Sequence, residues 1–283
     1  MIIESHAHYS HKRYDGTFRY LTGQLTAEEG NREGLLKRLR ESGVVLCIEP
    51  AIDFDSNRLT AALYRQHPDF FRLAVGVHPT RTAQAPWRQR KQLDDWARGP
   101  GVAAIGETGL DYHRPRHHRL VQLLWFRYQL DLARRLELPL VLHIRMADRD
   151  ALAMLRRRRR LPGGVVHCFQ GGWETARQYL DLGLCLGIGG ALLRQESAPL
   201  RETVARAPLE RLLVETDSPY VLPDVPREGS KKSLGRVRNS SLLLPRIIEE
   251  IARLKRLPPE AVEAAVLENT RRVFRLPDTK NGG

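Results

Sequence analysis

The middle of the chain reads GVAAIGETG at residues 101–109, HHRLVQLLWFRYQLDLARRLE at 117–137 and LPLVLHIR at 138–145. The first and third segments are short, apolar and rich in residues that favour β-strands. The second segment is long, and its apolar residues recur at the spacing of one helical face. A strand, a helix and another strand in this order predict two parallel strands joined by a crossover helix.

The same alternation extends over the whole chain. Further helical patterns occupy residues 33–43 and 175–183, and two more follow the last strand at 240–257 and 259–275. Eight strand-and-helix units over 283 residues match a TIM (β/α)8 barrel, an α/β fold. We expect one domain at residues 1–276 and a disordered tail at 277–283. The eight predicted strands are IIESHAH (2–8), VVLCIEP (44–50), FRLAVGVHP (71–79), GVAAIGETG (101–109), LPLVLHIR (138–145), GGVVHCF (163–169), LCLGIGG (184–190) and RLLVETDSP (211–219).

A doubly wound parallel sheet is the alternative architecture. Such a sheet would carry a glycine-rich fingerprint in its first strand-to-helix turn. The nearest match is GIGGAL at 187–192, which has Leu192 in place of the third glycine and lies late in the chain. The sequence therefore favours the barrel.

Composition limits the class of protein and its partners. Lys and Arg number 46 against 33 Asp and Glu, a net charge of +13, which favours a polyanion such as nucleic acid or simply gives a solubilising surface. No apolar run approaches the roughly 18 residues of a membrane span, and no secretory signal is recognised. Three widely spaced cysteines indicate reduced thiols in a cytoplasmic protein. The composition implies no obligate protein partner.

Histidines and carboxylates cluster at the ends of the predicted strands. His6 and His8 stand two positions apart on the first strand, so their side chains share a face. A TIM barrel builds its active site at the carboxyl ends of its strands, where all these groups would meet. Each alone could be a hydrogen-bonded neighbour or a helix cap, but burying them together is costly without a cation. The sequence therefore predicts a metal site. The residues at strand ends are His6, His8, His78, Glu107, His143, Arg145, His167, Glu215 and Asp217.

Several longer motifs make the sequence resemble the TatD family of metal-dependent hydrolases, which is related to the amidohydrolase barrels. They are SHAH, GVHP, AIGETGLDYHR, LVLHIRMAD, VVHCFQGG, LGIGG and LLVETDSPY, in this order along nearly the whole chain. GRVRNSS stands where the family usually has a basic residue followed by Arg-Asn. Family members are described as divalent-metal-dependent deoxyribonucleases that are often exonucleolytic.

The resemblance implies a ligand set for two divalent metal ions and activity supported by Mg²⁺. We expect the two ions to be Zn²⁺, Mn²⁺ or Mg²⁺. Glu107 would bridge the two ions and offset their mutual repulsion. Asp217 would also orient the attacking water and accept its proton, so Asp217 and Glu107 are the expected catalytic carboxylates. Four imidazoles suit Zn²⁺ or Mn²⁺ better than Mg²⁺. The implied ligands are His6, His8 and Asp217 for one ion, and His143 and His167 for the other.

Two other strand-end residues, His78 and Arg145, have two interpretations each. His78 and Arg145 either grip phosphate oxygens, as catalytic and substrate-binding residues, or support Glu107 and His143. Glu215 precedes Asp217 by two residues and is expected to lie deeper in the barrel. Cys168 is expected in the core.

Two basic segments are candidates for substrate binding. Residues 9–20 interleave Lys12 and Arg13 with aromatic residues that can stack on unpaired bases. Residues 227–241 include Arg238 and Asn239, which match the Arg-Asn of the family. Either segment could equally be an ordinary polar loop. The run at 156–160, five arginines, is expected at the opposite end of the barrel, as a solvated cap of a helix C-terminus.

The predicted function is hydrolysis of DNA phosphodiester bonds, from the 3' end of a single strand, by a water activated by two metal ions. The same ligands would serve a deacylase or a cyclic-amide hydrolase that acts on a small molecule. A nucleic-acid-binding protein with a vestigial site is the third alternative, although every ligand position holds a chemically competent residue.

Overall fold

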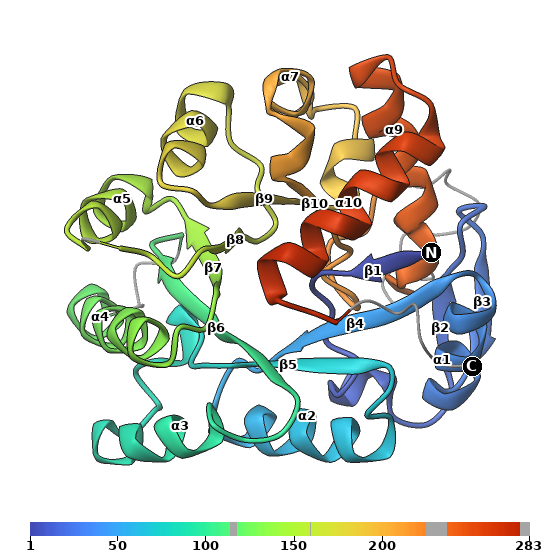
Figure 1. Cartoon of the computed structure of the whole chain (residues 1–283). Helices are drawn as coiled ribbons and strands as arrows, with labels where there is room; N and C mark the ends of the chain where they lie inside the picture. The colour runs from blue at the N-terminus through green and yellow to red at the C-terminus, as the bar shows by residue number, and fades with distance from the viewer. Residues whose placement is uncertain (114–117, 159, 225–236, 278–283) are drawn as a thin grey trace.

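Eight parallel strands form one sheet in the computed structural model of the chain, which describes residues 1–113, 118–158, 160–224 and 237–277 (Figure 1). Neighbours in the sheet follow the order of the chain from β1 to β10, which confirms the TIM-barrel prediction. The strands are β1 (Ile2–Glu4), β4 (Val44–Pro50), β5 (Phe71–Val75), β6 (Val102–Asp111), β7 (Leu140–Arg145), β8 (Gly164–Val166), β9 (Cys185–Ile188) and β10 (Leu212–Val214).

The helices surround this sheet, as Figure 1 shows. Each helical pattern recognised in the sequence corresponds to an observed helix whose ends differ by a few residues. Among the described residues, no helix is long and apolar enough to cross a membrane. The helices are α1 (Arg32–Glu41), α2 (Phe54–Gln66), α3 (Arg90–Trp96), α4 (Arg119–Leu136), α5 (Asp148–Arg156), α6 (Trp173–Asp181), α7 (Ala198–Arg206), α9 (Leu244–Lys255) and α10 (Pro259–Phe274).

The apolar core has two parts. The larger part packs the helices against the outside of the sheet and includes Trp125 and Ile248. The smaller part takes small or branched side chains from each of the eight strands, together with Phe274 at the end of α10. Side chains from every strand can share one cluster only inside a barrel, so this smaller part is the filled interior. Helix α10 covers one end of that interior (Figure 1).

The first and last strands close the barrel just beyond their regular ends. The Ser5 amide donates to the carbonyl oxygen of Val214 at 3.1 Å, and the His8 amide donates to that of Ser218 at 2.7 Å. Between them, the Asp217 amide donates to the carbonyl oxygen of His6 at 2.9 Å. The seam of the barrel therefore runs through the segments that carry three of the predicted metal ligands.

A small second sheet contains part of the first basic segment, which could have been an ordinary loop. Its strands are β2 (Phe18–Leu21), β3 (Ala27–Gly30) and β11 (Val237–Arg238), in the order β11-β2-β3. The prediction that the aromatic rings of residues 9–20 stack on unpaired bases is wrong, because these rings pack in the protein core. Each is at most 5% exposed: Tyr9, Tyr14, Phe18 and Tyr20.

The sequence predicts a disordered tail at 277–283. All of that segment except Pro277 lies outside the described residues. The same is true of Lys231, Lys232 and Arg236 in the second basic segment, and of Arg159 in the arginine run.

Gly164 opens β8 at the amino ends of the strands, where the backbones approach closely. Its φ is +141°, and an added Cβ would collide with the backbone carbonyl oxygen of Leu140. We expect Gly164→Ala to lower the free energy of unfolding by at least ~2 kcal/mol, through backbone strain and overpacking. Urea denaturation followed by circular dichroism measures the change. In the control Gly172→Ala the added Cβ meets no atom within 4 Å, so the loss should stay within about 1 kcal/mol.

Candidate metal centre

The structure brings all six predicted metal ligands together at the carboxyl ends of the strands. They come from five of the eight strands or from the residues that follow them directly. Segments far apart in the sequence thus meet at one mouth, as the barrel prediction requires. The six are His6 and His8 after β1, Glu107 in β6, His143 in β7, His167 after β8 and Asp217 after β10.

Among the described residues, donor atoms of these ligands and of three neighbours form four groups, three of which share residues. In each group the nitrogen, oxygen or sulfur atoms lie within 4.8 Å of one another, close enough to hold a metal ion. All six predicted ligands occur among them. The four groups are His6–His8–Asp217, His78–Glu107–His143, His6–His167–Glu215 and His167–Cys168–Asp217.

Glu107 lies at the centre of this constellation. Its side chain is 3% exposed, and one nitrogen of each of five imidazoles faces it. Burial alone would raise the pKa of this carboxyl, but the imidazoles of His78, His143 and His167 outweigh it and hold the pKa well below its usual value. The distances to a carboxylate oxygen are 2.9 Å from His143 Nδ1, 3.4 Å from His78 Nε2, 3.6 Å from His167 Nε2, 3.7 Å from His6 Nε2 and 3.8 Å from His8 Nε2.

Four of the five imidazoles are anchored through their other ring nitrogen. His8 Nδ1 lies 3.1 Å from the carbonyl oxygen of Pro50, and His78 Nδ1 lies 2.7 Å from the Thr80 hydroxyl. The other two anchored rings are held by carboxylates. Such outer hydrogen bonds fix the orientation and the tautomer of rings that bind metals.

Asp111 and Glu215 are the anchoring carboxylates. Asp111 Oδ2 lies 3.1 Å from His143 Nε2, and Glu215 Oε1 lies 2.9 Å from His167 Nδ1. Glu215 is completely buried, which agrees with the expectation that it lies deeper in the barrel. Asp111 is absent from the predicted site residues, although a signal for it exists. Asp111 follows Glu107 by four residues on the same strand, so both side chains point to one face.

Neighbouring charges set the protonation of the histidines. Burial disfavours the charged ring of His8, but its hydrogen bond to Asp217 outweighs burial and raises the pKa to about 9. Burial is likewise outweighed at His143, where hydrogen bonds to Asp111 and Glu107 raise the pKa to about 9. At His6 burial prevails, reinforced by a neighbouring imidazole, and the pKa falls well below its usual value. The cluster thus holds neutral and charged rings side by side.

Two buried polar atoms in this cluster have no hydrogen-bond partner among the described residues. They are Nδ1 of His6 and Oε2 of Glu215. The rings of His6 and His167 stack with centroids 3.5 Å apart. Unpaired buried donors and acceptors are rare and need compensation. Imidazole nitrogens and carboxylate oxygens in this density are the donor set of a transition-metal or zinc site, so the residues fit divalent cations.

A pocket of about 540 Å³ opens beside the cluster, with His143, His167 and Asp217 in its wall. Arg145 also lines it, a position compatible with the phosphate-binding interpretation of this residue, which stays a prediction. The Arg145 side chain is exposed and makes no hydrogen bond or ion pair within the described ranges. It is therefore available to a ligand in this pocket.

A second arginine, Arg194, lines the same pocket. Its guanidinium donates to the carbonyl oxygen of Leu222, at 2.9 and 3.2 Å. No sequence pattern predicts Arg194 as a site residue, because it follows a short 3₁₀ helix rather than a strand. The fold alone brings it to the mouth.

Several residues that line this pocket have left-handed backbones, among them three next to strand ends. Met146, Cys168 and Asp217 have φ angles of 53°, 48° and 54°. Residues other than glycine seldom adopt this conformation, and it concentrates at functional sites. The sequence predicts Cys168 in the core, but this residue lines the pocket and is partly exposed.

The surroundings of His78 suggest that it supports other site residues rather than binding substrate. Its Nε2 faces Glu107 and its Nδ1 is engaged by Thr80, so both nitrogens have partners. Its ring contacts that of His143 with centroids 4.2 Å apart. This geometry favours the interpretation of His78 as a residue that positions Glu107 and His143.

Asn239, expected to bind substrate, is completely buried. Its side-chain amide donates to the carbonyl oxygens of Thr216 and Val221, at 2.8 and 3.2 Å. Because this amide already donates to the backbone on both sides of Asp217, it is not available to a substrate. The structure therefore does not support direct binding by Asn239, which instead holds the segment around Asp217.

The other predicted substrate residues lie at the rim. Arg13 stacks over the ring of Tyr220 at 4.9 Å, and Tyr220 in turn lies 5.9 Å from the ring of His8. Arg238 Nε donates to the carbonyl oxygen of Arg13 at 3.0 Å. Lys12 is exposed next to Arg13 in the chain. Their role in binding stays a prediction.

Comparison with known proteins identifies relatives along the full length of the chain. The sequence profile of the family described as TatD related DNase matches residues 3–275. A protein of Rahnella sp. (strain Y9602) named 3'-5' ssDNA/RNA exonuclease TatD is 37% identical over 256 residues, covering 89% of this chain and 96% of that protein. A protein of Bacillus subtilis (strain 168) named uncharacterized metal-dependent hydrolase YabD is 29% identical over 278 residues, covering 98% of this chain and 100% of that protein.

A solved structure agrees. The crystal structure of YJJV, a TatD homolog from Escherichia coli K12, superimposes with a TM-score of 0.82 and 28% identity over 98% of both chains. The profile match, the level of identity and the barrel lead to one assignment. The chain belongs to the TatD-related DNase family of metal-dependent hydrolases.

Proposed function

We propose that this chain is a metal-dependent nuclease that removes nucleotides from the 3' end of single-stranded DNA or RNA. The observation that carries the proposal is the convergence of five imidazole nitrogens on the buried Glu107, beside a pocket lined by arginines. Relatives named 3'-5' ssDNA/RNA exonuclease support the substrate class.

Six residues would hold two divalent ions. When bound, such a pair of ions lowers the pKa of a water and polarises the phosphodiester. Protons that occupy His8 and His143 in the metal-free chain leave when those nitrogens become ligands. The ligands would be His6, His8 and Asp217 for one ion and His143 and His167 for the other, with Glu107 shared.

The side chains at the mouth would carry out the rest of the reaction. The Asp217 carboxylate lines the pocket, where it would accept the proton that the attacking water loses. The oxygen of that water attacks phosphorus and the bond from phosphorus to the 3' oxygen breaks. Asp217 returns its proton to the 3' oxygen, which leaves as a hydroxyl. Arg145, which lines the pocket, would bind the phosphate oxygens in a bidentate manner. The products are a nucleoside 5'-phosphate and a strand shortened by one nucleotide.

Removing the shared carboxylate tests the site directly. We expect Glu107→Ala to lower kcat on a single-stranded oligonucleotide by about a thousandfold or more, with Mg²⁺, Mn²⁺ or Zn²⁺ added, because both metal positions lose a ligand. Glu29→Ala, which changes an exposed carboxylate on β3, is the matched control and should retain full activity. Shortening of the strand is followed by gel electrophoresis, with EDTA as a second negative control. Turnover of an N-acyl or lactone substrate, with DNA and RNA left intact, would contradict the proposal.

Metal binding should depend steeply on pH. His8 and His143 have pKa values of about 9 in the metal-free protein, so at neutral pH both rings carry protons that a cation must displace. The apparent affinity for Zn²⁺ should therefore rise by about tenfold per pH unit for each proton released, and level off above about pH 9. Calorimetry in buffers of different ionisation enthalpy counts the protons. An affinity that stays constant from about pH 6 to about pH 9 would show that these nitrogens are not ligands.

The anchoring role of Asp111 gives a separate expectation. Asp111→Asn keeps the shape of the side chain but removes the charge that orients and polarises His143. We expect metal affinity to fall by about tenfold or more, with no loss of the fold. Competition with a zinc-binding dye measures the affinity, and a thermal melt checks the fold. Asp69→Asn, at an exposed carboxylate just before the amino end of β5, should leave the affinity unchanged.

A further inference from the structure

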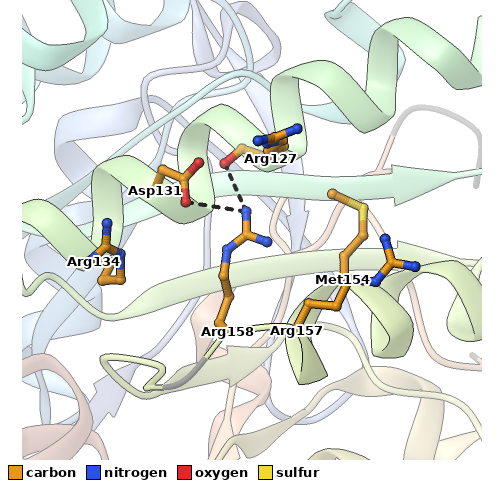
Figure 2. A pocket seen from close by; sticks show the side chains of 6 residues that line it. All are labelled: Arg127, Asp131, Arg134, Met154, Arg157 and Arg158. Atoms are coloured by element: carbon orange, nitrogen blue, oxygen red, sulfur yellow. Dashed lines mark hydrogen bonds and ion pairs between the residues drawn. The ribbon is translucent and has the colours of Figure 1, made fainter.

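A second pocket lies away from the metal centre, between α4 and α5, with a volume of about 540 Å³ (Figure 2). We refer to it as the arginine cleft. Four guanidinium groups line it against a single carboxylate. The lining residues are Arg127, Asp131, Arg134, Met154, Arg157 and Arg158.

The charges in the arginine cleft are not balanced within the described part of the chain. Arg158 lies 3.3 Å from Asp131 and donates to the carbonyl oxygen of Arg127 at 3.4 Å, as Figure 2 shows. Among the described residues, the guanidinium groups of Arg127, Arg134 and Arg157 make no hydrogen bond or ion pair with a side chain. Like charges held around one cavity repel each other, and an anion in the cavity would relieve this repulsion.

A helix dipole does not account for the whole cluster. Arg134 lies in the last turn of α4, and Arg157 follows the last turn of α5, where cations are favoured in any protein. Arg127 lies in the middle of α4, where the helix dipole does not stabilise a cation. The favourable position at a helix end therefore explains Arg134 and Arg157 but not Arg127, which lies outside the arginine run at 156–160.

Helix α5 connects the arginine cleft with the mouth of the barrel. Asp148, its first residue, lines the pocket beside the metal centre, and Arg157 follows its last residue. Nine residues of helix span about 13 Å. Arg149 is exposed on this helix and makes no side-chain hydrogen bond or ion pair with a described residue. A chain of phosphates leaving the mouth would thus meet cations at both ends of α5.

We propose that the arginine cleft binds the backbone of single-stranded nucleic acid upstream of the 3' end that lies at the metal centre. Guanidinium forks match both phosphate and carboxylate oxygens bidentately, and phosphate is favoured here because a strand held at the metal centre carries a row of phosphates along α5. Met154 adds an apolar wall that a sugar or base can contact. The inference rests on the proposed nuclease function, since it assigns the direction in which the substrate leaves the mouth.

The test compares two triple variants of equal charge. One carries Arg127→Gln, Arg134→Gln and Arg157→Gln in the cleft. The other carries three substitutions at exposed arginines elsewhere that have no side-chain partner among the described residues. Thermal melts establish that both variants fold like the parent protein. The control substitutions are Arg65→Gln, Arg98→Gln and Arg275→Gln.

Binding is measured first, with EDTA present so that the strand is not cut. The probe is a fluorescent strand of about 20 nucleotides, longer than the ~4–16 nucleotides of typical single-strand sites. The cleft variant should bind it about tenfold more weakly, and the slope of log affinity against log salt should become shallower by about 2, because three phosphate contacts are lost. For the control variant, neither the affinity nor the salt slope should change by more than about a third of the change seen in the cleft variant.

Turnover is measured second, with Mn²⁺ added. The cleft variant should show a raised KM for the long strand and unchanged kcat/KM for a dinucleotide, which is too short to reach the cleft. Equal behaviour of the two triple variants, or no binding of the strand by the parent protein, overturns the inference. Competition by polyglutamate as strong as that by the strand overturns it in favour of an acidic protein partner. Failure of the parent protein to cut any strand refutes the proposed function separately, because the binding comparison does not require cutting.

Discussion

The negative charge of Glu107 is the interaction on which the mouth of this barrel depends. A carboxylate so thoroughly removed from water is unstable without cations around it. The metal-free chain supplies them as protonated imidazoles: despite burial, Asp217 and Glu107 raise the pKa of His8, and Asp111 and Glu107 raise that of His143, to about 9. Protons and divalent ions therefore compete for the same nitrogens. Neutral His6 and charged His143 show that this arrangement is tuned by neighbours rather than by burial alone.

A second buried carboxylate, Glu4, holds the seam that makes this arrangement possible. Its oxygens accept hydrogen bonds from the amides of His6 and Thr216, at 3.1 and 3.0 Å, and from the hydroxyls of Thr216 and Ser241, at 2.6 and 2.7 Å. Burial raises its pKa to about 8. One side chain thereby fixes the residues next to the ligands on the first and last strands. The candidate metal centre and the closure of the barrel share the same few residues, His6, His8 and Asp217.

The fold and most of the site can be predicted from the sequence because their signals are local. Apolar runs define the strands, and polar residues at their ends, such as Glu107 and His143, meet wherever parallel strands are in register. What escapes prediction depends on contacts between distant segments. The pairing of β2 with β11 helps to bury Tyr14 and Phe18, although the two strands lie more than two hundred positions apart. The arginine cleft likewise exists only because α4 and α5 pack side by side, which no single segment reveals.

The seam also has a consequence for the order of events during biosynthesis. His6 is translated more than two hundred residues before Asp217, whose amide donates to its carbonyl oxygen. The nascent chain therefore carries these early histidines without their eventual neighbours throughout that interval. A cation captured then would be held by an incomplete set of donors. The full set of donors for a metal ion therefore exists only after Asp217 has been translated and has paired with the first strand.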